Sequence, residues 1–380
     1  MTEYDKEYFW YWFVNIKGIG NLTRVRLMER FGHPQYLYDC NLENQKDLLT
    51  ETQMGSISKS REYSRIEDGL KRLVEENIRF VHWESPDYPS RFRNLYDPPY
   101  GFYLKGELPD PNRPAVAVVG SRRPSQYGRK VSSMFASELA SKGIVIVSGM
   151  ASGVDSEAHR AALEVSGMTL GILGGGIDSM YPKENWNLYL DMYESGGILS
   201  EYNVGIPNRA GLFPMRNRLI SGISDFILVV EAGEKSGSLI TADQGMEQGK
   251  DVYVVPGRIT DIMSRGCNQL IAQGASVAES PQSFLDDLRT FCDSPKGRHL
   301  SLIPEERSGS EYVNKSISRQ PYTAEEHKIL EILDEIDAKS FDTILTQTGM
   351  SRSDLQHLLF GLEMRSCIVQ SQQNMYLKTI

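Results

Sequence analysis

The sequence contains few cysteines, and none of them has metal-binding spacing. Cys40, Cys267, Cys292 and Cys367 lie far apart and form no CxxC pair, so neither a zinc site nor a disulfide framework is indicated. The sequence also lacks an apolar run long enough to span a bilayer and a cationic, apolar secretory leader. We therefore expect a protein of the reducing cytoplasm, with no membrane partner.

An excess of positive charge is also missing. The 380 residues include 41 Lys and Arg against 50 Asp and Glu, a formal net charge of −9, which argues against a protein coated in nucleic acid. A local basic groove remains compatible with this total, because the field near a site follows the local charge. The length, with 40% hydrophobic and 24% charged residues, predicts two or three soluble globular domains.

Strand and helix patterns alternate between residues 115 and 280. The predicted strands are 115–119, 144–147, 168–173, 198–200, 226–230 and 252–255. Their nearly continuous apolar character predicts an α/β fold with a parallel sheet covered on both faces. In such sheets ligands bind beyond the carboxyl ends of the strands.

Residues 1–80 read as a small all-α domain. Two of its predicted helices flank Ile16-Lys17-Gly18-Ile19-Gly20, which resembles the hairpin of a helix-hairpin-helix module, where glycine lets backbone N–H groups approach a DNA phosphate. A plain glycine turn between packed helices explains the same residues. Both interpretations stay open. Residues 81–113, rich in proline and aromatics, read as a connector packed on the sheet, which gives a predicted domain over 81–292.

The tail divides into two parts. Residues 293–320 are rich in Ser, Pro and charge and predict a flexible linker. Residues 321–380 predict three helices and a β-hairpin, an order that resembles a winged helix. Five Lys and Arg face nine Asp and Glu there, and the acidic Asp354 and Glu363 lie on the would-be recognition helix, so we expect protein contact or packing rather than DNA reading.

The loops after the predicted strands are rich in glycine, serine and cations. Each one precedes a predicted helix, where free N–H groups and the helix dipole favour an anion. Eight of the 14 Lys and Arg between 115 and 280 fall in or near these loops: Arg122, Arg123, Lys183, Arg209, Arg216, Arg218, Lys235 and Arg258. The sequence therefore predicts that the surface at the carboxyl ends of the strands is more basic than the rest of the domain.

The stretch Phe213–Gly222 places two arginines just after Pro214, a residue that suits the start of a helix. Arg216 and Arg218 are two positions apart, so they would not share one helix face. Surface ion pairs would explain both arginines. The other features of the chain favour an anion-binding role instead.

We expect the protein to need no cofactor. A GxGxxG fingerprint is absent after the first strand, where Gly120 is followed by Ser121 and Arg122, and no Walker A loop occurs. Catalysis has little support, since His159, four residues after Asp155, is explained better by packing beside a helix-capping aspartate. Several glycine-bordered loops with arginines at different depths suit a chain of phosphates. Tyr181 and Phe213 are either base-stacking or core aromatics.

Several motifs in order resemble the DNA-processing protein A family (DprA, also called Smf). They cover roughly residues 80–280 and comprise Tyr88-Pro89, Asp97-Pro98-Pro99, Gly120-Ser121-Arg122, Ser148-Gly149-x-Ala151-x-Gly153-Val154-Asp155, Gly174-Gly175-Gly176, Tyr181-Pro182-x-x-Asn185, Phe213-Pro214-x-Arg216-Asn217-Arg218, Ser236-Gly237-Ser238, Val255-Pro256-Gly257 and Gly266-x-Asn268.

This resemblance implies an extended Rossmann-like domain, an N-terminal domain of the SAM or helix-hairpin-helix type and a C-terminal winged-helix-like domain. It also implies a cytoplasmic, non-catalytic protein that binds and protects single-stranded DNA and loads the RecA recombinase in natural transformation (competence) and recombination. The expected assembly is a homodimer through the Rossmann domain.

The resemblance and the loop chemistry together give the predicted DNA-binding residues. They are Ser121, Arg122, Gly149, Gly153, Lys183, Asn185, Arg216, Asn217, Arg218, Lys235, Ser236, Gly237 and Ser238.

Two other functions are weighed against this one. The first is a nucleotide-processing enzyme of the lysine-decarboxylase-like phosphoribohydrolase type, which carries Pro-Gly-Gly-x-Gly-Thr-x-x-Glu. This chain has Lys235-Ser236-Gly237-Ser238-Leu239-Ile240-Thr241-Ala242 in the corresponding loop, without the glutamate. The second is a scaffold that recruits partners through the acidic tail.

Overall fold

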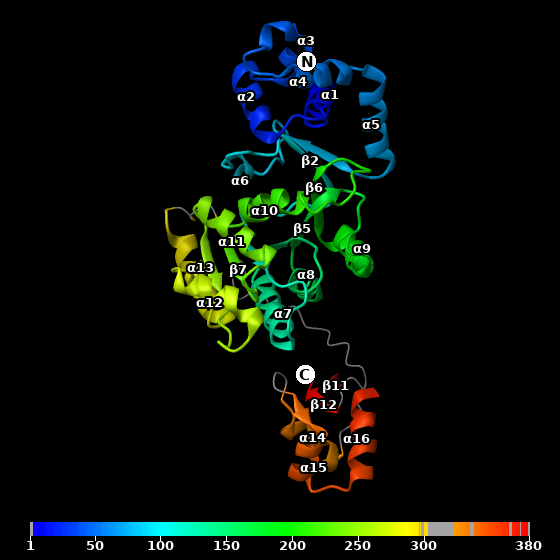
Figure 1. The fold of residues 1–380 in the computed structure, drawn as a ribbon, viewed down its shortest axis with the longest axis vertical. Helices are drawn as coiled ribbons and strands as arrows, with labels where there is room; N and C mark the ends of the chain where they lie inside the picture. The colour runs from blue at the N-terminus through cyan, green and yellow to red at the C-terminus, as the bar shows by residue number, and fades with distance from the viewer. Residues whose placement is uncertain are drawn as a thin grey trace. The chain divides into compact units, whose positions relative to one another are not determined.

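The computed structural model describes residues 3–295, 297, 300–302, 323–334, 338–364, 367–372 and 374–378. The chain divides into two compact units, Met1–Ser308 and Gly309–Ile380 (Figure 1). Among the described residues, no helix is long and apolar enough to cross a membrane.

A nine-stranded sheet forms the centre of the first unit. In chain order its strands are β1 (Arg79–His82), β2 (Gly101–Gly106), β3 (Ala115–Val119), β4 (Val145–Ser148), β5 (Thr169–Gly176), β6 (Gly197–Tyr202), β7 (Phe226–Val229), β8 (Asp251–Val254) and β9 (Ser276–Val277). Their order across the sheet is β1-β2-β6-β5-β4-β3-β7-β8-β9. Strand β2 runs antiparallel to both of its neighbours, and all other pairs are parallel. The predicted α/β fold is confirmed, and the predicted parallel sheet is mostly parallel, because β2 of the predicted connector joins it antiparallel.

Helices cover both faces of this sheet (Figure 1). One face packs against α7 (Gln126–Ser141), α8 (Val154–Glu164) and α13 (Pro281–Asp293). The other packs against α10 (Leu212–Ile223), α11 (Gly237–Glu247) and α12 (Arg265–Ala272). Successive strand residues point to opposite faces, so Val116 joins the first layer and Ala117 the second. This two-sided burial explains the continuous apolar strands.

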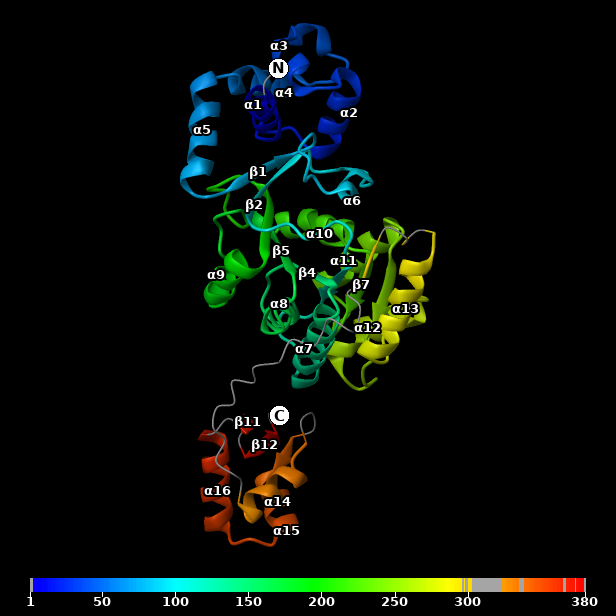
Figure 2. The ribbon, with the colours of Figure 1, turned by 180° about the vertical axis from the view of Figure 1, so that it is seen from behind.

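The N-terminal residues are helical, as predicted. They form α1 (Glu3–Val14), α2 (Asn21–Phe31), α3 (Pro34–Asp39), the 3₁₀ helix η1 (Leu42–Gln45), α4 (Glu51–Ser60) and α5 (Tyr63–Glu75), and α6 (Ser90–Arg93) follows β1. These helices gather beside β1 and β2 (Figure 2). Trp10, Trp12 and Phe13 of α1 share one core with Tyr103 of β2 and Leu173 of β5. A separate domain over 1–80 stays a prediction.

The glycine hairpin between α1 and α2 is a tight turn with Gly18 at φ +77°, a conformation that favours glycine. Arg24 of α2 closes it by donating from Nη2 to the Val14 carbonyl oxygen at 2.8 Å. Asn21 donates to Glu201 of β6 at 3.1 Å, so the turn leads directly into contacts with the sheet. A DNA contact at this turn stays a prediction.

The second unit has its own core. It contains α14 (Ala324–Ile332), β10 (Lys339–Ser340), α15 (Phe341–Thr348), α16 (Arg352–Met364), β11 (Ile368–Gln372) and β12 (Met375–Lys378). The strands form an antiparallel sheet in the order β10-β12-β11. The three helices and the hairpin are confirmed, and the winged-helix assignment stays a prediction.

Part of the predicted linker 293–320 is described. Leu300 is buried, and the Ser301 amide donates to the Asn112 carbonyl oxygen at 2.8 Å, so this part packs on the first unit. Most of the remainder, residues 303–320, lies outside the described residues.

Candidate functional site

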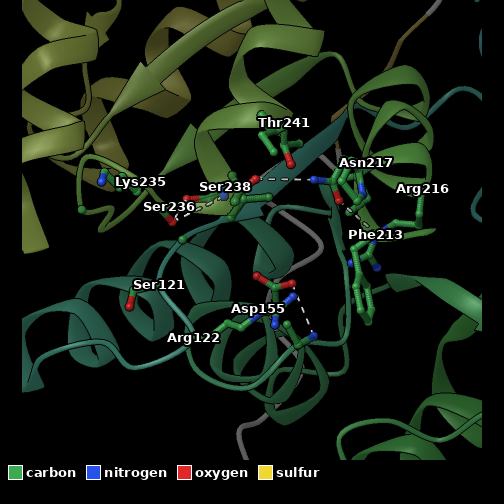
Figure 3. A pocket seen from close by; sticks show the side chains of 18 of the residues that line it. Ser121, Arg122, Asp155, Phe213, Arg216, Asn217, Lys235, Ser236, Ser238 and Thr241 are labelled. Atoms are coloured by element: carbon green, nitrogen blue, oxygen red, sulfur yellow. Dashed lines mark hydrogen bonds between the residues drawn. The ribbon is translucent and has the colours of Figure 1, made fainter. Parts of the chain in front are cut away.

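A cavity of about 1010 Å³ opens at the carboxyl ends of the central parallel strands. Its walls include residues that follow β3, β4 and β7 (Figure 3). The chain proceeds outward from β3 through β4, β5 and β6 and then returns to the other side of β3 with β7. The cavity therefore lies at the topological switch point, where open α/β sheets bind their ligands.

The loop after β3 places Ser121 and Arg122 at the cavity. The Ser121 amide donates to the Glu231 carbonyl oxygen at 2.7 Å, and its hydroxyl accepts from the Arg123 amide at 3.0 Å. The Arg122 side chain is exposed, and its guanidinium carbon lies 5.2 Å from the centre of the Phe213 ring. Ser121 therefore fixes the loop, while Arg122 offers a free cationic face to a ligand.

Gly149 and Gly153 shape the loop after β4. A Cβ atom on Gly149 would lie 2.6 Å from the Arg216 guanidinium, and one on Gly153 would lie 2.4 Å from the Ser121 carbonyl oxygen. Gly153 also has φ +83°. Both glycines therefore allow close approach between loops, and Gly149 lines only a narrow passage beside the cavity.

Arg216 forms part of the cavity wall from α10, although it is buried. Its Nη1 donates to the carbonyl oxygens of Gly149, at 2.7 Å, and Ile172. Burial lowers the pKa of Arg216 to about 10, so the side chain is still cationic at neutral pH. Its Nε donates to the Asn217 amide oxygen at 3.1 Å, which orients Asn217 toward the same wall.

Arg218 does not line the cavity, so the structure gives no support to its prediction as a DNA-binding residue. Its Nη2 lies 2.7 Å from a carboxylate oxygen of Glu201, and its Nε lies 3.0 Å from Asp97. Two helix positions separate Arg218 from Arg216, so the side chains leave α10 in different directions. These two half-buried carboxylates hold Arg218 on the side that faces β6 and the connector.

The loop after β7 forms the opposite wall. Ser236 caps α11, and its hydroxyl lies 2.7 Å from that of Ser238. Asn217 donates to the Gly237 carbonyl oxygen at 3.5 Å, which joins this wall to α10. Lys235 is exposed at the rim of the cavity.

The predicted residues Lys183 and Asn185 do not line the cavity, although Asn185 lines a second hollow beside it. Lys183 begins the 3₁₀ helix η2 (Lys183–Asn185), just before α9 (Trp186–Ser195), and is exposed. Asn185 is buried; it donates to the Met150 carbonyl oxygen and accepts from Arg160, each at 3.1 Å. Asn185 therefore braces the loop after β4.

Asp155 lines the cavity but is not among the predicted site residues. Its carboxylate accepts from the amides of Gly149 at 3.1 Å and Ala151 at 3.4 Å. The expected helix cap is wrong, because Gly153 is the N-cap of α8 and Asp155 instead ties down the preceding loop. Burial raises the pKa of this carboxyl group. The sequence signal that could have identified Asp155 is its position just after a glycine-rich loop.

His159 is packed in the core, as expected. Its Nδ1 lies 2.6 Å from the Thr169 hydroxyl, and burial lowers the pKa of His159 to about 3.

Tyr181 and Phe213 both line the cavity, with ring centres 6.1 Å apart. Tyr181 is about half exposed, at 49%, and Phe213 is half-buried. The two rings give the wall flat, polarisable surfaces, and Arg122 places a cation beside them. Such a surface can stack on a nucleobase and pair with a phosphate.

Comparison with known proteins identifies the family. The sequence model for "DNA recombination-mediator protein A" matches residues 79–289, a span that runs from β1 into α13 and contains the whole cavity. The chain belongs to this family.

Relatives in the recombination-mediator family extend the match. DNA processing protein DprA of Bacillus subtilis is 38% identical over 227 residues, which cover 60% of this chain and 76% of the relative. Protein Smf of Escherichia coli is 40% identical over 225 residues, 59% of this chain and 60% of the relative. Protein Smf of Synechocystis is 29% identical and covers 96% of this chain and 97% of the relative.

Two solved structures of the family are similar to this chain. DprA of Streptococcus pneumoniae aligns with a TM-score of 0.64 at 31% identity and covers 72% of this chain and 95% of that one. DNA processing protein A of Helicobacter pylori aligns with a TM-score of 0.51 at 32% identity and covers 56% of this chain and 96% of that one. The Helicobacter pylori study describes a single-stranded DNA binding mode for its protein.

Proposed function

We propose that this chain binds single-stranded DNA at the cavity and acts as a non-catalytic recombination mediator. The observation that carries the proposal is the exposed Arg122 guanidinium over the Phe213 ring at the cavity mouth. A strand can place a phosphate on the cation and stack a neighbouring base on an aromatic ring. The study of the Helicobacter pylori relative supports this choice of ligand.

The remaining walls suit the same ligand. Lys235 adds a cation at the opposite rim, and Arg216 with Asn217 supplies polar groups on the wall formed by α10. Ser236, Gly237 and Ser238 open α11, whose N-terminus favours a phosphate. These contacts recognise the backbone and flat bases without reading base edges, so we expect little sequence preference.

The carboxylates near the cavity support binding rather than catalysis. Among the described lining residues, the acids are Asp155 and Glu234. Asp155 is engaged by two backbone amides, and the exposed Glu234 lies 3.7 Å from Arg265. The neighbouring Glu231 accepts two hydrogen bonds from Ser125. Asp155 and Glu231 therefore serve to fix the loops, and Glu234 lies in an exposed ion pair, which favours a binding role over hydrolysis.

Further parts of the proposal concern assembly and partners. The bound strand would be protected from nucleases and passed to the RecA recombinase, during natural transformation or general recombination in the cytoplasm. Two copies would pair through their Rossmann domains. Lys183 stays a proposed contact for a strand that leaves the cavity, because its side chain is exposed.

A salt series with labelled oligo-dT tests the binding site. We expect wild type to prefer oligo-dT over its duplex, and Arg122→Ala to weaken binding by about tenfold or more, as loss of one charged contact predicts. The slope of log K against log salt should fall by about 0.7 for one lost phosphate contact.

Lys71→Ala is the matched control, since Lys71 is an exposed cation on α5 and its loss changes the net charge equally. Equal weakening of DNA binding by Arg122→Ala and Lys71→Ala would show that the effect comes from overall charge and not from a contact at the cavity. Absence of oligo-dT binding by wild type, or release of a free base from a nucleoside monophosphate, would reject the proposed function.

A further inference from the structure

A second hollow of about 660 Å³ lies beside the cavity. Four arginines line it: Arg122, Arg123, Arg129 and Arg160. They come from the loop after β3, from α7 and from α8. None of these side chains is buried, so the hollow presents guanidinium groups from three elements to one solvent-filled space.

Two carboxylates offset part of this charge. Glu157 lies 3.3 Å from Arg129 and 3.6 Å from Arg160, and Glu184 accepts a short hydrogen bond from the Ser152 hydroxyl. Four arginines against these two acids leave an excess of two positive charges in the lining. The described structure shows no carboxylate paired with Arg122 or Arg123, so these two arginines are the best placed to meet an anion.

The backbone at this hollow also favours an anion. Gly153 and Ser156, at the start of the 11-residue helix α8, line it, and a helix N-terminus carries a partial positive charge. Any side chain at Gly153 would collide with the Ser121 carbonyl oxygen. The Val154 amide donates to the Ser121 carbonyl oxygen at 3.1 Å, so the start of α8 packs closely against the loop that carries Arg122 and Arg123.

The second hollow adjoins the cavity. Arg122 and Tyr181 line both spaces. A narrow passage of about 30 Å³ between them is lined by Arg122, Ser152, Tyr181, Pro182, Phe213 and Arg216, with Gly149 and Ala151. A ligand with a repeating phosphate could therefore cross from one space to the other along the exposed side of Arg122.

We propose that the second hollow is an additional phosphate subsite for the same DNA strand, which leaves the cavity over Arg122 and Tyr181. This inference rests on the proposed function, since it assigns the next part of the strand rather than a separate ligand. Arg123 and Arg129 bind phosphates beyond those held in the cavity. The footprint on the strand is longer than the cavity alone can accommodate.

A length series separates the two spaces. Binding of oligo-dT from four to 20 nucleotides is measured for wild type and for Arg123→Ala/Arg129→Ala. The ratio of the two Kd values should stay near one for the shortest oligonucleotide that wild type binds and rise to about tenfold or more for the longest. For the longest strand, the salt slope should fall by about 1.4, since two phosphate contacts are lost.

Lys59→Ala/Lys71→Ala removes the same charge from exposed positions on α4 and α5 and serves as the control. An effect of Arg123→Ala/Arg129→Ala that is equal at all lengths, absent at all lengths, or matched by the control would overturn the subsite. Wild type that binds no oligo-dT would instead reject the proposed function, so the two failures are distinguishable.

A change of opposite sign gives an independent check. Glu184→Gln removes a negative charge from the hollow and keeps an oxygen that accepts from Ser152. It should tighten binding of long strands more than that of short ones, whereas unchanged or weaker binding of long strands would contradict the proposal. Inorganic pyrophosphate should compete only at concentrations far above those of the strand; tight competition would assign the hollow to a free phosphate compound.

Discussion

His159 is buried and uncharged in the folded protein, which makes stability depend on pH. Its pKa is lowered to about 3 by burial, against about 6.5 in an unfolded chain. Between these values the unfolded chain binds more protons, so stability falls as the pH falls. From pH 8 to pH 5 the free energy of unfolding should decrease by about 2 kcal/mol through this residue.

Urea unfolding of wild type and His159→Gln at pH 8 and pH 5 measures how much His159 contributes to the change in the free energy of unfolding. The variant should lose about 2 kcal/mol less than wild type on acidification, whatever its stability at pH 8. His82, stacked on Trp10, has its pKa lowered to about 4 by burial and should contribute a second share that persists in the variant. An identical pH dependence of the two proteins would show that His159 is not buried as the fold has it.

Arg216 and Arg218 show what a single sequence can and cannot give at the residue scale. Their spacing predicts different helix faces, and the structure has them so. Which of them reaches the cavity depends on Gly149 and Ile172 on one side and on Glu201 and Asp97 on the other. These partners come from distant segments, so no local pattern reveals the choice.

At the scale of elements, Arg218 joins α10 to β6 and to the connector before β2. Its side chain is 6% exposed and lies against Glu201 and Asp97. Arg218→Ala would leave two largely buried carboxylates without their cation, which should cost about 3 kcal/mol of unfolding free energy. Chemical denaturation measures this loss.

DNA binding separates this structural role from a role in the site. At a temperature where Arg218→Ala is still folded, it should bind oligo-dT as wild type does, in contrast to Arg122→Ala. Weaker DNA binding with unchanged stability would return Arg218 to the list of contacts.

Strands buried on both faces could be predicted from the sequence, and those at the sheet edges could not. The runs at β3 and β7 are apolar throughout, and those at β4 and β8 are apolar except for one terminal residue each, because helices cover both sides. Strand β9 contains only Ser276 and Val277, both exposed, and its pairing with β8 depends on tertiary contact. The loops of the site were predictable for a similar reason, because they follow the buried strands directly.

At the scale of the whole chain, the two units have separate hydrophobic cores. Ile329, Leu355 and Leu362 belong to a core confined to the second unit, whereas the cavity lies within the first. A chain that ends at residue 302 should therefore fold and bind oligo-dT with nearly unchanged affinity and salt slope. Fluorescence anisotropy of the shortened and full-length chains tests this expectation.

A large loss of affinity in a shortened chain that keeps its helical circular dichroism would instead give the acidic second unit a part in DNA binding. The order of predicted elements gave this division into parts, since the hydrophobic pattern fades after residue 293. The shared core of the N-terminal helices and the sheet was not foreseeable, because local periodicity shows that α1 is apolar but not which surface covers it.

The close packing around glycine backbones at and beside the cavity limits how this protein can vary over generations. A methyl group on any of several glycines would meet a neighbouring atom within 2.8 Å: Gly120, Gly149, Gly153, Gly174 and Gly175. Rim side chains such as Lys235 can be exchanged while the cavity keeps its form, and each exchange adjusts affinity in a small step. Inherited differences in binding strength should therefore accumulate at the rim, whereas the glycines allow little neutral drift.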